Sequence, residues 1–206
     1  KTATNILLQS AFISTGQRCT CTRRLIVNKG KTACEGDRII RNLVEASDKL
    51  LIGEYTDTPE PFMGPMVTTS AVKTILDAQT NLVSMGGKIL KEFKRIGGVT
   101  SKLVEPGIID VTDIKNLPDE EYFGPLLQVI RSENFDHAIE IANDTKYGLV
   151  SGVITKNKNL FWKAEAELKT GIVNWINKIN SNLTPIITGN LVFTVSNNGY
   201  LYVIEK

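Results

Sequence analysis

The chain has 206 residues, of which 24 are basic and 22 acidic, so its formal net charge is +2, and 42% of its residues are hydrophobic. These ordinary values exclude collagen-like, disordered and disulfide-scaffold proteins, and the length suits one large domain or two small ones. No apolar run approaches the roughly 20 residues of a membrane-spanning helix, and residues 1–17 lack a secretory apolar core. We therefore expect a soluble cytoplasmic protein with no membrane partner.

Apolar residues at helical spacing alternate with short strand-like runs over the first 130 positions. Serine or threonine before a helix and glycine just after it supply the expected boundaries. The expected elements are helices ending at Gly16, over 35–51 and from a cap at Thr68, Thr69 or Ser70 to Gly86, with strands over 24–27, 107–111 and 126–130.

The densest basic stretch of the chain covers residues 88–96. Lys88, Lys91, Lys94 and Arg95 interleave there with apolar side chains. This spacing is typical of the solvated face of an amphipathic helix rather than of a polyanion-binding patch. We therefore expect no nucleic-acid partner.

Helices and strands continue to alternate after residue 130. Helices are predicted over 134–142 and 157–169, and strands over 149–154 and 172–175. Such alternation predicts an α/β domain with a mostly parallel sheet flanked by helices. His137, the only histidine, lies on the predicted outer face of its helix, so we expect it to be solvated rather than catalytic.

The pattern changes near the end of the chain. Residues 181–204 carry no charged side chain, and three strand-like runs, over 185–188, 191–196 and 200–204, are separated by Gly- and Asn-rich turns. This arrangement predicts a short C-terminal β-meander. The helix–strand alternation of the first 175 residues does not predict such a meander, so we assign 1–178 and 179–206 to separate domains.

The chain has three cysteines, Cys19, Cys21 and Cys34, which form no disulfide framework and indicate a reducing compartment. With one distant histidine they do not match a metal site, so we expect no metal. Arg18, Arg23 and Arg24 crowd the turn around Cys19 with only neutral neighbours, an electropositive setting that favours a thiolate. Cys19 is therefore a candidate nucleophile, and a buried, inert cysteine is the alternative.

An acidic loop over 118–125 is the second feature with possible chemistry. It places Glu120 and Glu121 beside Phe123, which Gly124 and Pro125 would hold in position. A carboxylate can accept a ribose hydroxyl and an aromatic ring can stack on a flat ligand. The alternative is a plain acidic loop with a buried phenylalanine.

Five segments resemble, in order, the signatures of the aldehyde dehydrogenase superfamily, most closely its succinylglutamate-semialdehyde dehydrogenase branch. They cover residues 10–24, 61–64, 106–112, 120–128 and 171–175. The resemblance implies an aldehyde dehydrogenase catalytic domain in which Cys19 is the nucleophile, Glu121 binds the nicotinamide ribose and Phe123 lies beside the nicotinamide. It gives no catalytic role to Cys21 or Cys34.

The same resemblance implies an activity and its partners. The family oxidises a small-molecule aldehyde to a carboxylic acid with NAD, or alternatively NADP, through a cysteine thiohemiacetal and thioester. For this branch the substrate would be N-succinylglutamate 5-semialdehyde and the setting arginine catabolism.

Several family segments do not occur among the 206 residues. They are the G-x-G-x-x-G turn, the Glu-Leu-Gly-Gly segment with the general base, the asparagine that helps stabilise the oxyanion, and the terminal oligomerising strand. The resemblance thus implies a catalytic-domain fragment, inactive by itself and without the family-type homo-oligomer. Its tail resembles a short repeat of quinoprotein-like β-propellers and would have a different origin.

Two other functions stay open on the sequence alone. Cys19 could act as a reactive thiol that an activated ester acylates without any cofactor. The chain could also be a non-enzymatic binding or assembly module whose C-terminal strands add to another sheet.

Overall fold

The computed structural model describes residues 2–29, 34–169, 186–188, 191–195 and 201–205. The chain divides into two compact units, Lys1–Thr170 and Gly171–Lys206. We describe each unit by itself.

A four-stranded sheet forms the centre of the first unit, in the order β1, β6, β5, β2. The strands are β1 (Arg24–Asn28), β6 (Leu126–Ser132), β5 (Gly107–Asp110) and β2 (Lys88–Lys91). β6 is parallel to both β1 and β5, whereas β2 is antiparallel to β5. The predicted mostly parallel sheet is therefore confirmed.

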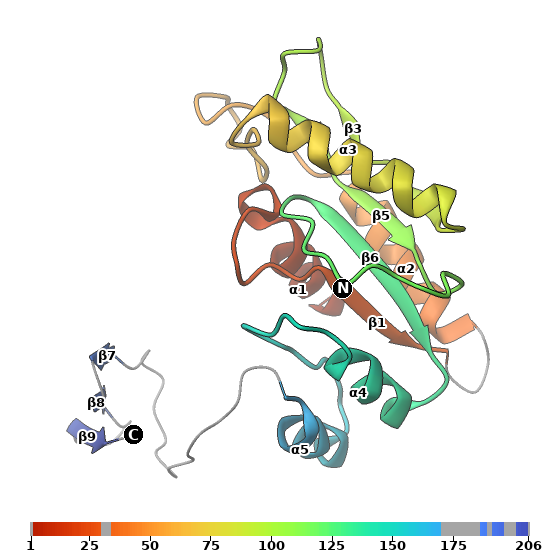
Figure 1. Ribbon diagram of the computed structural model, residues 1–206. Helices are drawn as coiled ribbons and strands as arrows, with labels where there is room; N and C mark the ends of the chain where they lie inside the picture. Colours follow the sequence, from red (N-terminus) through yellow and green to blue (C-terminus); the bar gives the residue numbers. More distant parts are fainter. Residues whose placement is uncertain (1, 30–33, 170–185, 189–190, 196–200, 206) are drawn as a thin grey trace. The chain divides into compact units, whose positions relative to one another are not determined.

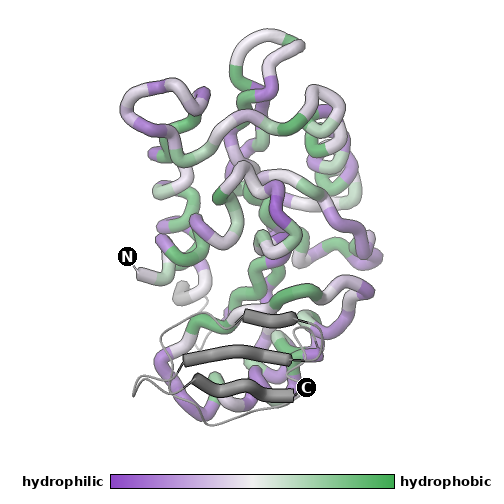
Figure 2. Tube along the Cα trace, turned by 90° about the vertical axis from the view of Figure 1, so that its left-hand side faces the viewer, coloured by the Kyte–Doolittle hydropathy of each residue, from purple (hydrophilic) through white to green (hydrophobic). Residues whose placement is uncertain are grey.

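Helices cover both faces of this sheet. They are α1 (Thr2–Phe12), α2 (Cys34–Ser47), α3 (Thr69–Ser84), α4 (Phe135–Asn143) and α5 (Lys158–Glu167). In Figure 1, α3 lies in front of the sheet and α2 behind it. Hydrophobic and hydrophilic stretches alternate along the chain (Figure 2), as expected when each helix turns one face toward a sheet.

The core lies between the sheet and these helices. Its fully buried side chains come from strands, helices and the connections between them, including Phe12, Leu43, Met63, Ile75, Phe93, Ile108 and Leu127. Because parallel strands bury both faces, β5 and the first half of β6 consist of buried residues.

Polar side chains set three helix starts where the sequence predicted them. The side chain of Thr68 accepts a hydrogen bond from Ala71 N at the start of α3. Asn134 caps α4 and Asn157 caps α5 in the same way. Each cap satisfies backbone N–H groups that have no partner inside the helix.

The second helix ends at Ser47, four residues before its predicted end at residue 51. Beyond Ser47 the backbone pairs with another segment instead: Phe62 N donates to Leu51 O, and Gly53 N donates to Met63 O. These tertiary hydrogen bonds outweigh the local helical pattern.

Two predicted elements are wrong. The basic stretch 88–96 is not helical but forms β2 and β3 (Lys94–Arg95), and β3 pairs with β4 (Val104–Glu105). Strand partners that lie further along the chain cause this, because Ile89 pairs with Ile109 of β5 and Lys94 pairs with Glu105 of β4.

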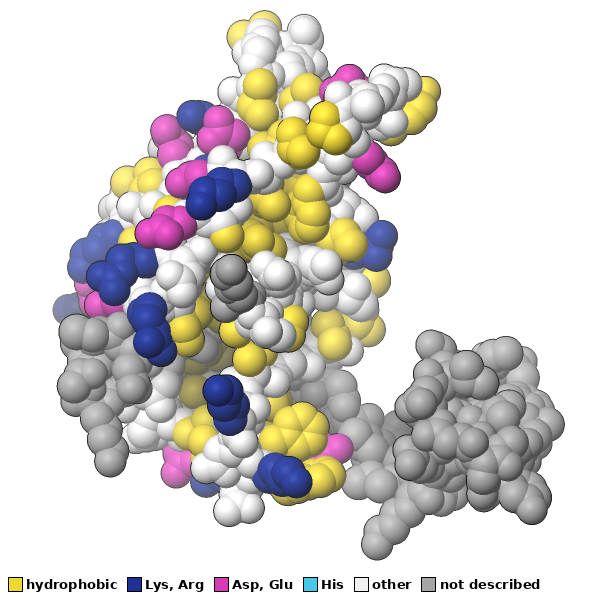
Figure 3. Space-filling view, turned by 180° about the vertical axis from the view of Figure 1, so that it is seen from behind, with side chains coloured by type: hydrophobic (Ala, Val, Ile, Leu, Met, Phe, Trp, Pro, Cys, Tyr) yellow, Lys and Arg dark blue, Asp and Glu magenta, His cyan; other side chains and the backbone are white. Residues whose placement is uncertain are grey.

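The second wrong element is the strand predicted over 149–154, which is irregular. Its apolar side chains Leu149, Val150 and Ile154 are exposed, as are Phe161 and Trp162 of α5. Figure 3 shows hydrophobic side chains gathered in the middle of one face and again near its lower end. The strand predicted over 172–175 lies outside the described residues.

The second unit contains the predicted meander. Strands β7 (Ile186–Thr188), β8 (Leu191–Val195) and β9 (Leu201–Glu205) form an antiparallel sheet with β8 in the centre. The domain boundary expected between 178 and 179 stays a prediction.

Candidate active site

The parallel pairing of β1 with β6 brings the two candidate motifs together. Arg24 lies opposite Gln128 in this register. Cys19 and Phe123 each stand five positions before one of these partners, so both segments enter the sheet at the same end. Two motifs about a hundred residues apart in the sequence thus become neighbours.

The cysteine segment is a tight turn between α1 and β1. A 3₁₀ helix, η1 (Ile13–Gly16), opens it, and Ser14, Thr15 and Gly16 all have positive φ. Thr15 Oγ1 donates to Gly64 O, and Gln17 Oε1 accepts from Val67 N. These two hydrogen bonds hold the turn against the segment before α3.

The two described cysteines of this turn differ in environment. Cys19 is exposed, whereas Cys21 is buried and its thiol donates to Ile13 O at 3.6 Å. The alternative of a buried, inert cysteine therefore applies to Cys21 and not to Cys19.

The acidic loop presents its phenylalanine outward. Phe123 is 45% exposed and Glu121 is also exposed, whereas Tyr122 between them is 6% exposed. Burial raises the pKa of Tyr122. The alternative of an acidic loop with a buried phenylalanine is therefore wrong: tyrosine anchors the loop, and the phenylalanine ring faces outward.

Arg23 contacts both segments. Its guanidinium donates to Gly16 O at 2.7 Å and to Arg18 O at 3.0 Å. It also pairs with the Glu121 carboxylate, with 3.5 Å between Nε and Oε1, and lies 4.9 Å from the centre of the Phe123 ring.

A second arginine anchors the base of the acidic loop. Arg24 Nη2 donates to Asp119 Oδ1 at 3.0 Å, and Asp119 also accepts from Thr145 Oγ1 and Lys146 N. Burial alone would raise the pKa of Asp119, but the bonds from Lys146 and Thr145 and the charge of Arg24 hold it below its usual value.

These contacts correct the expectation that the arginines have only neutral neighbours. Arg23 and Arg24 each pair with a carboxylate of the acidic loop. The third arginine of the turn, Arg18, is exposed, as is Cys19 next to it. The sequence could not reveal these pairs because their partners lie about a hundred positions away.

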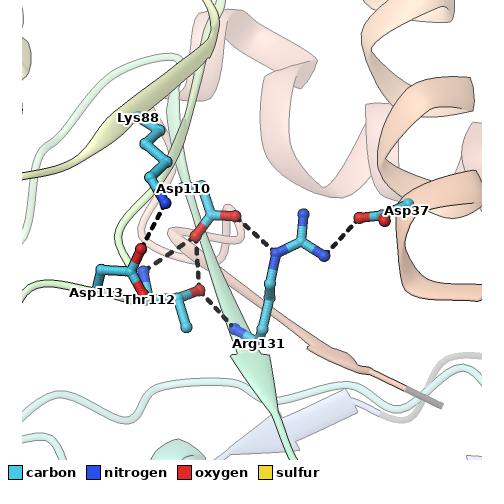
Figure 4. Close-up of polar contacts among 6 residues, drawn as sticks. All are labelled: Asp37, Lys88, Asp110, Thr112, Asp113 and Arg131. Atoms are coloured by element: carbon cyan, nitrogen blue, oxygen red, sulfur yellow. Dashed lines mark hydrogen bonds and ion pairs between the residues drawn. The ribbon is translucent and has the colours of Figure 1, made fainter. Parts of the chain in front are cut away.

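A separate polar cluster lies at the opposite end of β5 and β6 (Figure 4). Arg131 donates to Asp110 at 2.8 Å and to Asp37 of α2 at 2.6 Å, and Thr112 Oγ1 donates to Asp110 at 2.6 Å. Burial alone would raise the pKa of Asp110, but the hydrogen bonds from Thr112 and Arg131 lower it overall. This cluster joins helix to sheet and contains no candidate nucleophile.

A cleft of about 940 Å³ borders this cluster, lined by residues such as Arg24, Asp119, Arg131 and His137, but not by Cys19, Glu121 or Phe123. His137 is partly buried, and its Nδ1 accepts a hydrogen bond from Glu133 N.

Within the described ranges, no group of three His, Cys, Asp or Glu side chains could hold a metal ion. No helix of the described part is long and apolar enough to cross a membrane.

Sequence comparison finds a match over most of the chain. Residues 1–189 match the model of the aldehyde dehydrogenase family. The chain is 47% identical over 173 residues to N-succinylglutamate 5-semialdehyde dehydrogenase of Serratia proteamaculans, a stretch covering 84% of this chain and 34% of that protein. The chain therefore spans about a third of the length of this curated relative.

Solved structures are similar in fold. Lactaldehyde dehydrogenase of Escherichia coli superposes with a TM-score of 0.73 at 29% identity, covering 82% of this chain and 35% of that one. Betaine aldehyde dehydrogenase of Staphylococcus aureus, solved with NAD+, gives a TM-score of 0.72 at 26% identity over 82% of this chain and 33% of that one. By its sequence match and by its α/β fold, this chain belongs to the aldehyde dehydrogenase family.

Proposed function

We propose that this chain carries the nucleophile and the nicotinamide-facing loop of an NAD(P)-dependent aldehyde dehydrogenase. One observation carries the proposal: an exposed cysteine turn and an exposed Glu–Phe loop meet at one end of the sheet and share Arg23. Family membership supports the reaction class. In this proposal Cys19 is the nucleophile, and Glu121 and Phe123 face the cofactor.

The chemistry begins at the thiol of Cys19. Its thiolate attacks the aldehyde carbon, a C–S bond forms, and the carbonyl π electrons move to oxygen to give the thiohemiacetal in its alkoxide form. NAD(P), when bound, supplies the acceptor for the hydride. Oxidation leaves a thioester on Cys19, and water then cleaves the C–S bond to release the carboxylic acid and free thiol.

The residues of the loop fit the nicotinamide end of such a cofactor. The Glu121 carboxylate can accept hydrogen bonds from ribose hydroxyls, and the exposed face of Phe123 can stack on a flat heterocycle. No G-x-G-x-x-G turn occurs in the 206 residues, so the chain's own residues offer no such cradle for the phosphates. Glu121 and Phe123 therefore fit the nicotinamide riboside part of the cofactor.

For the substrate we propose N-succinylglutamate 5-semialdehyde, a step of arginine catabolism in the cytoplasm. The support is the 47% identity to a relative of that name over most of this chain.

Acylation by p-nitrophenyl acetate tests the nucleophile without requiring the cofactor. The thiolate attacks the ester carbonyl and expels p-nitrophenolate, so the acetyl group stays on sulfur as a thioester. Because Cys19 is exposed and Cys21 is buried, we expect acetylation at Cys19 to exceed that at Cys21 by about tenfold or more. Peptide mass mapping after a short exposure measures the ratio.

Two variants complete this test. Cys19→Ser should abolish the fast release of p-nitrophenolate, and Cys21→Ser, the matched control, should retain it. Equal acetylation of the two cysteines, or fast release that persists in Cys19→Ser, would contradict Cys19 as the nucleophile.

A further inference from the structure

The Arg23 side chain is the most highly connected charged group at the candidate active site. It is 13% exposed and donates to two carbonyls of the cysteine turn, Gly16 O and Arg18 O, both just before Cys19 in the sequence. Its other contacts go to the acidic loop, where it pairs with Glu121 and lies over the Phe123 ring.

The shape of the arginine side chain suits this position. A guanidinium is planar and carries five N–H donors in a fixed fork, so its two terminal nitrogens can serve carbonyls while its face covers an aromatic ring. Lysine has the same charge but concentrates it at one flexible ammonium group. It cannot make these four contacts together.

The backbones of the two segments also touch where Arg23 joins them. A Cβ added to Gly16 would lie 2.6 Å from Gly124 O, so only a glycine allows this approach. Gly124 in turn is close to Ile75 of α3, which supports the loop from the other side. Arg23 therefore sits at a packed junction.

We propose that Arg23 is a positioning residue that holds Glu121 and Phe123 in a fixed relation to Cys19. This inference deepens the proposed function and rests on it. Arg23 acts through the residues it holds: it occupies one face of the Phe123 ring, leaving the other for a ligand, and it ties the Glu121 carboxylate to the carbonyls of Gly16 and Arg18 that precede Cys19. Arg24 serves a different segment, because it pairs with Asp119 at the base of the loop.

A double-mutant cycle on the 206-residue chain tests this link. The readout is the rate constant for iodoacetamide alkylation of Cys19, measured by mass mapping. Glu121→Gln releases Arg23 from its partner, so we expect the Cys19 rate to change by about twofold or more, as for groups coupled through a shared contact. In an Arg23→Gln background the same substitution should leave the rate unchanged.

Glu120→Gln is the matched control, because it removes a neighbouring exposed carboxylate for which no contact with Arg23 is observed. It should change the Cys19 rate equally in both backgrounds. Arg23→Lys keeps the charge and loses the fork, so the lysine variant should behave like Arg23→Gln. A lysine variant that retains the full coupling would overturn the proposal.

Amide hydrogen exchange supplies a second readout, which distinguishes a local loosening of the two segments from a variant that is poorly folded throughout. Arg23→Lys should speed amide exchange in both segments, 14–21 and 119–125, while the amides of α3 keep their protection. Loss of protection throughout the chain, or in one segment only, would contradict a specific link.

The two proposals fail in distinguishable ways. If the double variant changes the alkylation rate of Cys19 by the product of the effects of Glu121→Gln and Arg23→Gln, the two residues act independently. That result would overturn the role of Arg23, even if Cys19 is acetylated selectively. Unselective acetylation would overturn the proposed function, while the alkylation cycle would still report the link between the two segments.

Discussion

At the residue scale, Gly16 shows how strictly the backbone of the cysteine turn is determined. Its φ is +64°, and an added Cβ would meet the carbonyl group of Gly124 at 2.6 Å. Both the conformation and the space therefore require glycine. The carbonyl of the same residue accepts the hydrogen bond from Arg23.

We expect Gly16→Ala to lower the free energy of unfolding by about 1–3 kcal/mol, because alanine is strained at positive φ and would push the acidic loop away. Urea unfolding followed by circular dichroism measures the change. Gly152→Ala is the matched control, since an added Cβ there has open space and no positive φ is involved. A Gly16→Ala chain as stable as the control would contradict this account of the turn.

At the element scale, the cluster in Figure 4 joins α2 to the sheet. Asp110 accepts from Arg131 and Thr112, and Arg131 extends to Asp37 of the helix. The pKa of Asp110 lies below its ordinary value in the native state. The ionised carboxylate therefore stabilises the fold at every pH above the unfolded pKa of about 3.9.

Asp110→Asn removes this charge and should cost about 1.5–3 kcal/mol at pH 7, the usual contribution of hydrogen bonds to a charged group. The difference from wild type should shrink below about pH 4, because wild-type Asp110 loses its contribution as the pH falls through its native pKa. Urea titrations between pH 7 and 3 measure this trend.

Asp113→Asn controls for a general charge effect. Its ion pair with Lys88 is exposed on both sides, so its loss should have little effect on the free energy of unfolding at any pH. A penalty for Asp110→Asn that does not depend on pH would show that the cluster is not stabilised by the ionised carboxylate.

At the scale of the whole molecule, the chain holds the proposed nucleophile turn and the proposed nicotinamide-facing loop, but its sequence contains neither the Glu-Leu-Gly-Gly segment nor a Gly-rich phosphate turn. A general base alone is typically worth about 10²–10⁴ in rate. We therefore expect the 206-residue chain to produce little or no NADH from N-succinylglutamate 5-semialdehyde and NAD.

Absorbance at the NADH band measures this turnover, with the Serratia proteamaculans relative as the positive control. NADH formation that Cys19→Ala abolishes would show that the chain is active by itself.

The assembly alternative, in which the C-terminal strands add to another sheet, stays a prediction. Its basis is the meander, in which β8 is central and β7 and β9 are the outer strands.

The secondary structure near each polar cap could be predicted from the sequence, because a cap acts within a few residues. Thr68, Asn134 and Asn157 begin helices where expected. The spacing of the stretch 88–96 fits the solvated face of a helix, whereas its backbone pairs with β5 and β4. Local pattern decides an element only where no distant partner competes.

The sequence by itself determined the α/β class, the family resemblance and the candidates Cys19, Glu121 and Phe123, since all of these rest on residue type and order along the chain. Only the tertiary structure decided which groups meet. The parallel register of β1 and β6 places the two motifs at one end of the sheet, and Arg23 joins them. Contacts between residues a hundred positions apart depend on strand pairing and packing, which a linear pattern does not encode.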